Sequence, residues 1–165
     1  VLAKSLELRS LHPQHKIPSA LIDDVEIFES SAICEYLCDS LPGNNLLAPS
    51  GSRERAIHSQ WVSFSQSEAE AFLWHNFLLK RSEKGLESCQ ETLEINHHMA
   101  LEGLRVLNEH LERSEYLCGV HFSLADIIVG WTINWARRGS LISSFGHLNN
   151  YLDRLFERTH CVLAR

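Results

Sequence analysis

The apolar residues of the first forty positions follow a strand pattern in two short runs and then change to helical spacing. Residues 17–22 and 25–28 are rich in β-branched and aromatic residues, and two aspartates lie between them, which is typical of a hairpin turn. Ser30 or Ser31 can then cap a helix that runs to about residue 40, with its apolar residues on one face. The pattern therefore predicts a short β-hairpin followed by a helix.

The remainder of the chain has a different pattern. Residues 43–52 concentrate glycine, asparagine, proline and serine, which is typical of a linker between domains. Past this linker the strand pattern disappears, and helices are expected at 53–79 and 91–112 and from about residues 124, 145 and 159. We therefore expect an α+β, mostly helical fold, with a small N-terminal domain over 1–42 and an all-helical bundle over 53–165.

The helix expected from residue 124 has an unusual beginning. It is apolar over most of its length, and the segment FSLAD precedes it, with Ser123 at the N-cap and Asp126 three residues later. This spacing predicts a capping box, in which serine and carboxylate satisfy each other's backbone N–H groups. We assign Asp126 a structural rather than a catalytic role and expect Asp126→Ala to lower stability by roughly 1 kcal/mol or more without changing ligand affinity.

Composition and charge exclude several functions. The 165 residues carry a formal net charge of −6 and contain no block of lysine and arginine, which argues against a nucleic-acid surface. No apolar run approaches the roughly 20 residues that a membrane span needs, and no secretory signal is visible. The five cysteines fit neither a disulfide framework nor a zinc clamp, so we expect reduced thiols and a cytoplasmic protein. A metal shared by Cys34, Cys38 and a histidine is the weaker alternative, and we expect no metal.

Charged residues flank the predicted hairpin in a way that a structural hairpin does not need. Lys16 precedes an Ile17-Pro18 pair, and a cis bond there would leave the Ile17 backbone free to pair with a peptide. At the other end, Glu29 can bind an ammonium group, and the helix that begins at Ser30 can bind a carboxylate through its N–H groups. These features fit a peptide-like ligand with a carboxylate at each end and an amine near one end, which is the layout of glutathione.

These motifs resemble those of one protein family. HKIPSALIDDVEIFESSAICEYL resembles the glutathione-binding half of the thioredoxin-like domain of cytosolic glutathione S-transferases. QWVSFSQSEAE, YLCGVHFSLADIIVGWTINWARR and LNNYLDRLFERTHCVLAR resemble helices of the family's C-terminal bundle. The resemblance covers nearly the whole chain and implies a partial thioredoxin-like domain followed by the all-α domain.

The resemblance also implies roles for individual residues. Ile17 would pair with the cysteinyl backbone of glutathione, and Pro18 would be the family's cis-proline. Glu29 and Ser30 would hold the γ-glutamyl end, and Lys16 would lie near the glycyl carboxylate.

Three further assignments follow from the same resemblance. His15, at a position that is often glycine, would contribute to the site, and Glu68 would reach the γ-glutamyl amine of the neighbouring subunit in a homodimer. Trp131, Trp135 and Arg137-Arg138 could border the pocket for the electrophile, but we expect them to fill the bundle.

One departure leaves two functions open. Residues 1–4 resemble the end of the family's second strand, so we expect the preceding strand-helix-strand and its thiol-activating tyrosine, serine or cysteine to be absent from this sequence. The leading hypothesis is an enzyme that transfers the thiolate of glutathione to small electrophiles. The alternative is a non-catalytic interaction module of the type found in elongation factor 1 gamma and in tRNA-synthetase scaffolds.

Overall fold

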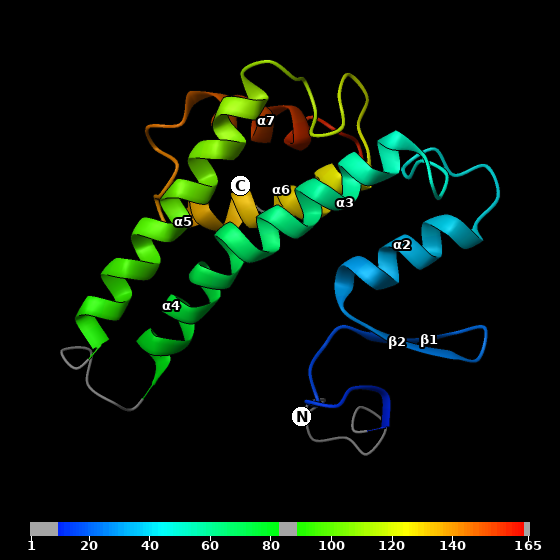
Figure 1. Cartoon of the computed structure of the whole chain (residues 1–165), viewed down its shortest axis with the longest axis horizontal. Coiled ribbons are helices and arrows are strands. Elements are labelled where there is room, and N and C mark those ends of the chain that lie inside the picture. Colours follow the sequence, from blue (N-terminus) through cyan, green and yellow to red (C-terminus); the bar gives the residue numbers. More distant parts are fainter. Residues whose placement is uncertain (1–9, 83–88, 164–165) are drawn as a thin grey trace. The chain divides into compact units, whose positions relative to one another are not determined.

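The computed structural model describes residues 10–82 and 89–163, so the strand end expected at residues 1–4 lies outside the described residues. The chain divides into two compact units, one extending to Pro49 and the other beginning at Ser50 (Figure 1). The expected α+β, mostly helical fold is confirmed. The domain limits 1–42 and 53–165 remain predictions.

The N-terminal unit contains a β-hairpin and one helix. Strands β1 (Ser19–Ile22) and β2 (Val25–Phe28) pair antiparallel, with Ser19 opposite Phe28. The loop between them has positive φ at both of its residues, Asp23 (49°) and Asp24 (64°), as a two-residue hairpin loop requires. Aspartate tolerates this left-handed conformation better than most residues, which explains the pair of aspartates.

The hairpin ends at its open side with Pro18, which precedes β1, and Glu29, which follows β2. β1 begins two residues later than the pattern predicted, because Pro18 has no N–H to contribute to the strand ladder. After β2 the chain turns at Glu29 and enters helix α2 (Ser30–Ser40), which matches the predicted helix.

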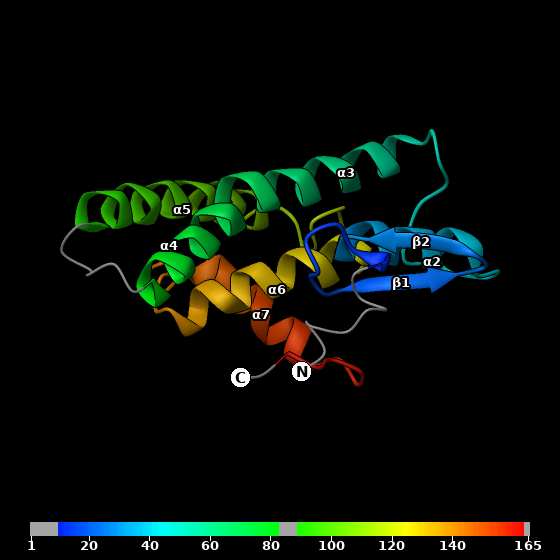
Figure 2. The same ribbon diagram turned by 90° about the horizontal axis from the view of Figure 1, so that it is seen from below.

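The C-terminal unit is a helical bundle (Figure 2). Its elements are α3 (Arg53–Ser65), η2 (Gln66–Glu70), α4 (Ala71–Arg81), α5 (Gln90–Leu111), α6 (Leu124–Arg138) and α7 (Gly146–Phe156). α4 and α5 lie side by side, α3 packs on α6, and α7 packs on both α5 and α6. The core between them includes the fully buried Leu104, Leu107, Val129, Ile133 and Tyr151.

The helix predicted at 53–79 is interrupted by a π-helical turn. In η2 the backbone N–H of Ala71 donates to the carbonyl of Gln66, one residue further back than in an α-helix. α5 passes this turn closely, since a Cβ at position 103 would overlap the carbonyl oxygen of Glu68. Gly103 is therefore required where α5 meets the π turn.

The helix predicted from about residue 159 is wrong. Residues 157–163 form turns and irregular chain, with an isolated bond from the Cys161 N–H to the Arg158 carbonyl. Threonine, histidine and cysteine are poor helix formers, and this short segment lacks enough of a buried face to compensate.

The capping box expected at the start of α6 is present and extends beyond the helix end. The Ser123 N–H and hydroxyl both donate to Oδ2 of Asp126, at 2.8 and 2.9 Å. Oδ1 accepts from the Leu117 N–H and from the Tyr151 hydroxyl, each at 2.9 Å. The fully buried Asp126 thus joins α6 to α7 and to the loop that precedes α6.

Candidate functional site

The first group of predicted site residues forms an exposed segment that leads into β1. Lys16, Ile17 and Pro18 are all exposed, and the Ile17 side chain is 74% exposed. The Ile17–Pro18 peptide bond is cis, as the resemblance implied. Because β1 begins only at Ser19, the backbone N–H and C=O of Ile17 lie outside the strand ladder.

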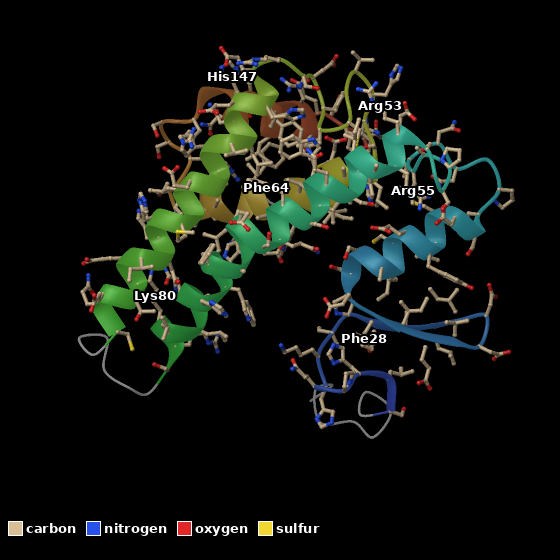
Figure 3. The ribbon with its side chains drawn as sticks, viewed as in Figure 1. Phe28, Arg53, Arg55, Phe64, Lys80 and His147 are labelled. Atoms are coloured by element: carbon tan, nitrogen blue, oxygen red, sulfur yellow. The ribbon has the colours of Figure 1, made fainter. Side chains whose placement is uncertain are left out.

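A buried histidine holds this segment in place. His12 is only 6% exposed, and its ring centroid lies 5.0 Å from that of Phe28 on β2 (labelled in Figure 3). Its Nδ1 accepts from the Gln14 N–H at 3.0 Å, and its carbonyl accepts from the His15 N–H at 2.9 Å. Sequence reasoning missed this role, since a single histidine before a proline gives no signal of burial.

His15 occupies a backbone conformation that favours glycine. Its φ is 55°, in the left-handed region, which agrees with the glycine that the resemblance implies at this position. The imidazole is exposed on the same segment as Lys16.

The second group of predicted residues lies where β2 passes into α2. Glu29 has φ 72° and ψ 122°, and its carbonyl accepts the first helical bond, from the Ile33 N–H at 3.0 Å. Its exposed side chain makes no capping hydrogen bond. The carboxylate is therefore not required to cap the helix and is accessible to a cationic group.

The hairpin register brings these two groups together. Since Ser19 pairs with Phe28, the preceding Pro18 and the following Glu29 leave the same end of the hairpin. Paired strands lie about 5 Å apart, so the two groups are neighbours despite the residues that separate them in sequence. One exposed surface is thus bordered by a lysine, a carboxylate, the start of a helix and a peptide group that is not paired in the sheet. Such a surface can bind an extended zwitterionic peptide by charge and by backbone pairing.

Glu68 lies in the C-terminal unit, on the π-helical element η2. Its Oε1 accepts from the Ser67 hydroxyl at 3.0 Å, and its side chain is half-buried. Its assignment to a partner subunit's glutathione remains a prediction.

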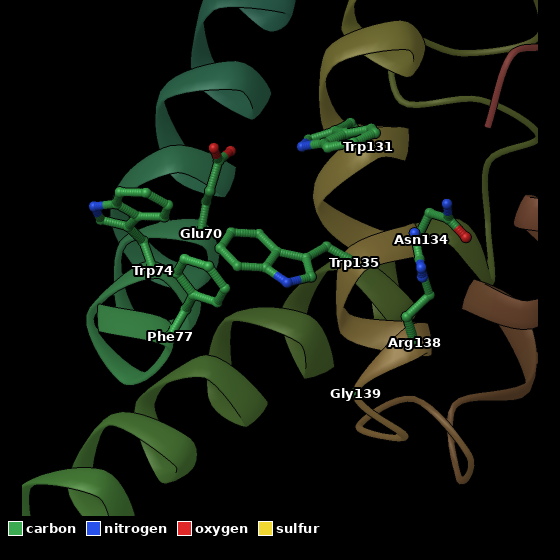
Figure 4. Close-up of a pocket in the computed structure, with 8 residues that line it drawn as sticks. All are labelled: Glu70, Trp74, Phe77, Trp131, Asn134, Trp135, Arg138 and Gly139. Atoms are coloured by element: carbon green, nitrogen blue, oxygen red, sulfur yellow. The ribbon is translucent and has the colours of Figure 1, made fainter. Parts of the chain in front are cut away.

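The C-terminal unit also contains a pocket of about 570 Å³ between η2–α4 and α6 (Figure 4). Half of its lining residues are aromatic; the full lining is Glu70, Trp74, Phe77, Trp131, Asn134, Trp135, Arg138 and Gly139. Trp131 is 57% exposed, so the expectation that it fills the bundle is wrong. Trp135 has a mixed role, since it lines the pocket and also packs edge-on against Trp74 and Phe77.

Two of the cysteines have thiols that are poorly suited to nucleophilic chemistry. Burial, with smaller contributions from Cys38 and Glu35, raises the pKa of the Cys34 thiol. Burial also raises the pKa of Cys118, against a lowering effect of the hydrogen bond with Ser123. Both thiols therefore stay protonated at neutral pH.

None of the five cysteines, all of which lie within the described ranges, forms a disulfide bond. Over the described ranges 10–82 and 89–163, no three histidine, cysteine or acidic side chains come together as metal ligands. No helix within those ranges has the length and apolar character of a membrane span.

Comparison with known proteins identifies relatives of both units. The family model "Glutathione S-transferase, C-terminal domain" matches residues 99–154, which extend from α5 into α7. The chain is 27% identical over 151 residues to glutathione S-transferase GstA of Escherichia coli O157:H7, covering 90% of this chain and 72% of that protein. It is 32% identical over 157 residues to elongation factor 1-gamma of Prunus avium, covering 94% of this chain and 36% of that protein.

A solved structure extends the likeness to three dimensions. The crystal structure of a glutathione S-transferase from Pseudomonas fluorescens Pf-5 superposes with a TM-score of 0.80 at 25% sequence identity. The match covers 97% of this chain and 79% of that protein's chain, so it includes the hairpin and the bundle.

Proposed function

The chain belongs to the glutathione S-transferase superfamily, and on that premise we propose that it binds glutathione and transfers the glutathione thiolate to a small electrophile. In this reaction the sulfur forms a bond to the electrophilic carbon, a leaving group departs with its bonding electrons, and the thiol proton passes to solvent. Glutathione is a co-substrate rather than a bound cofactor. We further propose a cytoplasmic homodimer and the domain division at residues 43–52.

The arrangement at the open end of the hairpin supports the glutathione site. Lys16 is suited to the glycyl carboxylate, the Ile17 backbone to the cysteinyl peptide unit, and Glu29 to the γ-glutamyl ammonium. The N–H groups in the first turn of α2, from Ser30, are suited to the γ-glutamyl carboxylate because the helix dipole favours an anion there. The main support for the proposal is that these residues lie at the same end of one hairpin.

Three assignments complete the proposed site. Pro18 fixes the chain beside Ile17, and His15 borders the glycyl end. Glu68 would reach the glutathione bound by the second subunit of the dimer.

Retention on immobilised glutathione tests the proposal. We expect the protein to be retained and to be eluted by free glutathione, and we expect Glu29→Ala to be recovered in the flow-through. A protein that folds but passes through the column unretained would contradict the proposal.

The likeness to elongation factor 1-gamma supports a second candidate function, an interaction module of a translation complex. The two functions differ in what the protein binds in cells. Isolation of a tagged protein together with elongation factors or tRNA synthetases, and without glutathione affinity, would favour the module. Glutathione affinity without these partners would favour the transferase.

A further inference from the structure

Two helix faces provide the walls of the pocket in the C-terminal unit. Glu70, at the end of the π turn, is followed at spacings of four and three residues by Trp74 and Phe77 on α4, so the three lie on one face. Trp131, Trp135 and Arg138 have the same spacing on α6. Figure 4 shows these two faces opposite each other, with the Glu70 carboxylate between Trp74 and Trp131.

The π turn determines which residues reach the pocket. It inserts one extra residue into the helical repeat, which rotates all following side chains by about 100° relative to an uninterrupted helix. Without it, the face formed by Glu70, Trp74 and Phe77 would not be the one that meets α6.

Glu70 is held in a fixed position at the pocket wall. Its Oε2 accepts from the hydroxyl of Thr132 at 2.8 Å, and Thr132 is fully buried. Glu70 itself is half-buried, so solvent screens its charge only in part.

The aromatic walls add to the negative potential of this carboxylate. The faces of indole and phenyl rings attract cations, and indole does so most strongly. A cation already lies against this cluster, since the Arg81 guanidinium is 5.3 Å from the ring centroid of Phe77. Arg81 is not one of the lining residues, and the pocket retains three tryptophans.

Arg138 is the opposing charge among the lining residues. Its side chain is exposed, whereas Glu70 is half-buried and hydrogen-bonded. An exposed charge is largely screened by water and salt, so its repulsion is weaker than the attraction of the carboxylate and the aromatic faces.

We propose that this pocket binds a planar aromatic cation, with its ring among the tryptophans and its charge paired with Glu70. The binding is independent of glutathione. That the cation is the electrophile which receives the thiolate rests on the proposed function.

Calorimetric titration with three ligands of matched shape tests the proposal in the absence of glutathione. The probes are 1-methylquinolinium (a cation), 1-methylnaphthalene (neutral) and 1-naphthoate (an anion). We expect the cation to bind about three- to tenfold more tightly than the neutral compound, and the anion to bind most weakly.

Variants separate the contribution of charge from that of shape. Glu70→Gln keeps an oxygen for the Thr132 hydroxyl, so the pocket is preserved, while the preference for the cation falls at least about twofold to the part that the aromatic faces supply. Glu112→Gln makes the same charge change at an exposed position outside the pocket and leaves the preference intact. Trp131→Ala weakens the binding of both the cation and the neutral compound, because it removes part of the aromatic wall.

Three results would overturn the proposal. They are equal affinity for the cation and the neutral compound, tighter binding of the anion than of the cation, and failure of all three probes to bind. A preference for the cation that is undiminished in Glu70→Gln would also refute the assigned role of the carboxylate. Retention on glutathione is measured separately, so failure of this site and failure of the glutathione site can be told apart.

Discussion

Replacing Asp126 by alanine removes the acceptor of four hydrogen bonds. Two of the donors, the Ser123 N–H and hydroxyl, lie at a partly buried helix end, and their loss resembles the loss of a helix cap, about 1 kcal/mol. The other two, the Leu117 N–H and the Tyr151 hydroxyl, belong to residues that are 1% and 0% exposed. Each buried donor left without an acceptor costs about 1–3 kcal/mol.

We therefore expect Asp126→Ala to lower the free energy of unfolding by about 3–7 kcal/mol, well above the effect of a cap alone. Urea-induced unfolding, followed by circular dichroism and by tryptophan fluorescence, measures this difference. Asp126→Asn should lose less, since its amide oxygen still accepts from Leu117 and Tyr151.

A double mutant isolates the bond between α6 and α7. In Asp126→Ala/Tyr151→Phe the tyrosine hydroxyl is absent, so nothing is left unpaired at that point. The double mutant should be more stable, by about 1–2 kcal/mol, than the sum of the two single effects implies. A cost of only 1 kcal/mol for Asp126→Ala, or strictly additive effects, would refute the buried network.

Three further outcomes are expected. Burial, with the Asp126 carboxylate, raises the pKa of Tyr151 well above 10.0. The folded protein therefore keeps a proton that the unfolded chain loses, so the free energy of unfolding should fall as pH rises above about 10. The fall should be shallower in Tyr151→Phe, and equal slopes would contradict the assignment. Gly103→Ala should lower the free energy of unfolding in urea by about 1–3 kcal/mol, because the new methyl overlaps the Glu68 carbonyl. Gly146→Ala, with no atom within 4 Å of its Cβ, should be neutral or stabilising. His12→Ala should weaken glutathione binding at least about threefold, measured by calorimetry, because the Lys16 segment loses a residue that holds it. It should also lower the free energy of unfolding by about 1–3 kcal/mol, measured in urea, because the packing on Phe28 is lost.

Local rules explain which features could be predicted from the sequence. The two aspartates at the hairpin loop and the Ser123–Asp126 spacing act over a few residues, so their chemistry can be read directly from the chain. The helical spacing also predicted the bounds of α2 and α5 and the start of α6 to within about two residues.

Tertiary contacts explain what the sequence did not reveal. The π turn at η2 is accommodated by Gly103, which lies on another helix. His12 is buried and packs against Phe28, and Trp131 is exposed because the pocket leaves its side chain partly uncovered. The additional partners of Asp126, Leu117 and Tyr151, come from segments distant in sequence, so a capping motif alone could not reveal them.

The central claim is that one end of a hairpin binds glutathione through Glu29 and its neighbours. Calorimetric titration of glutathione into Glu29→Gln and into Glu26→Gln tests it most directly, since both changes remove one exposed carboxylate from the same hairpin. We expect Glu29→Gln to bind glutathione at least about tenfold more weakly than the unmodified protein, as the loss of a charge-assisted hydrogen bond implies, and Glu26→Gln to bind normally. Equal affinities of the two variants for glutathione would contradict it.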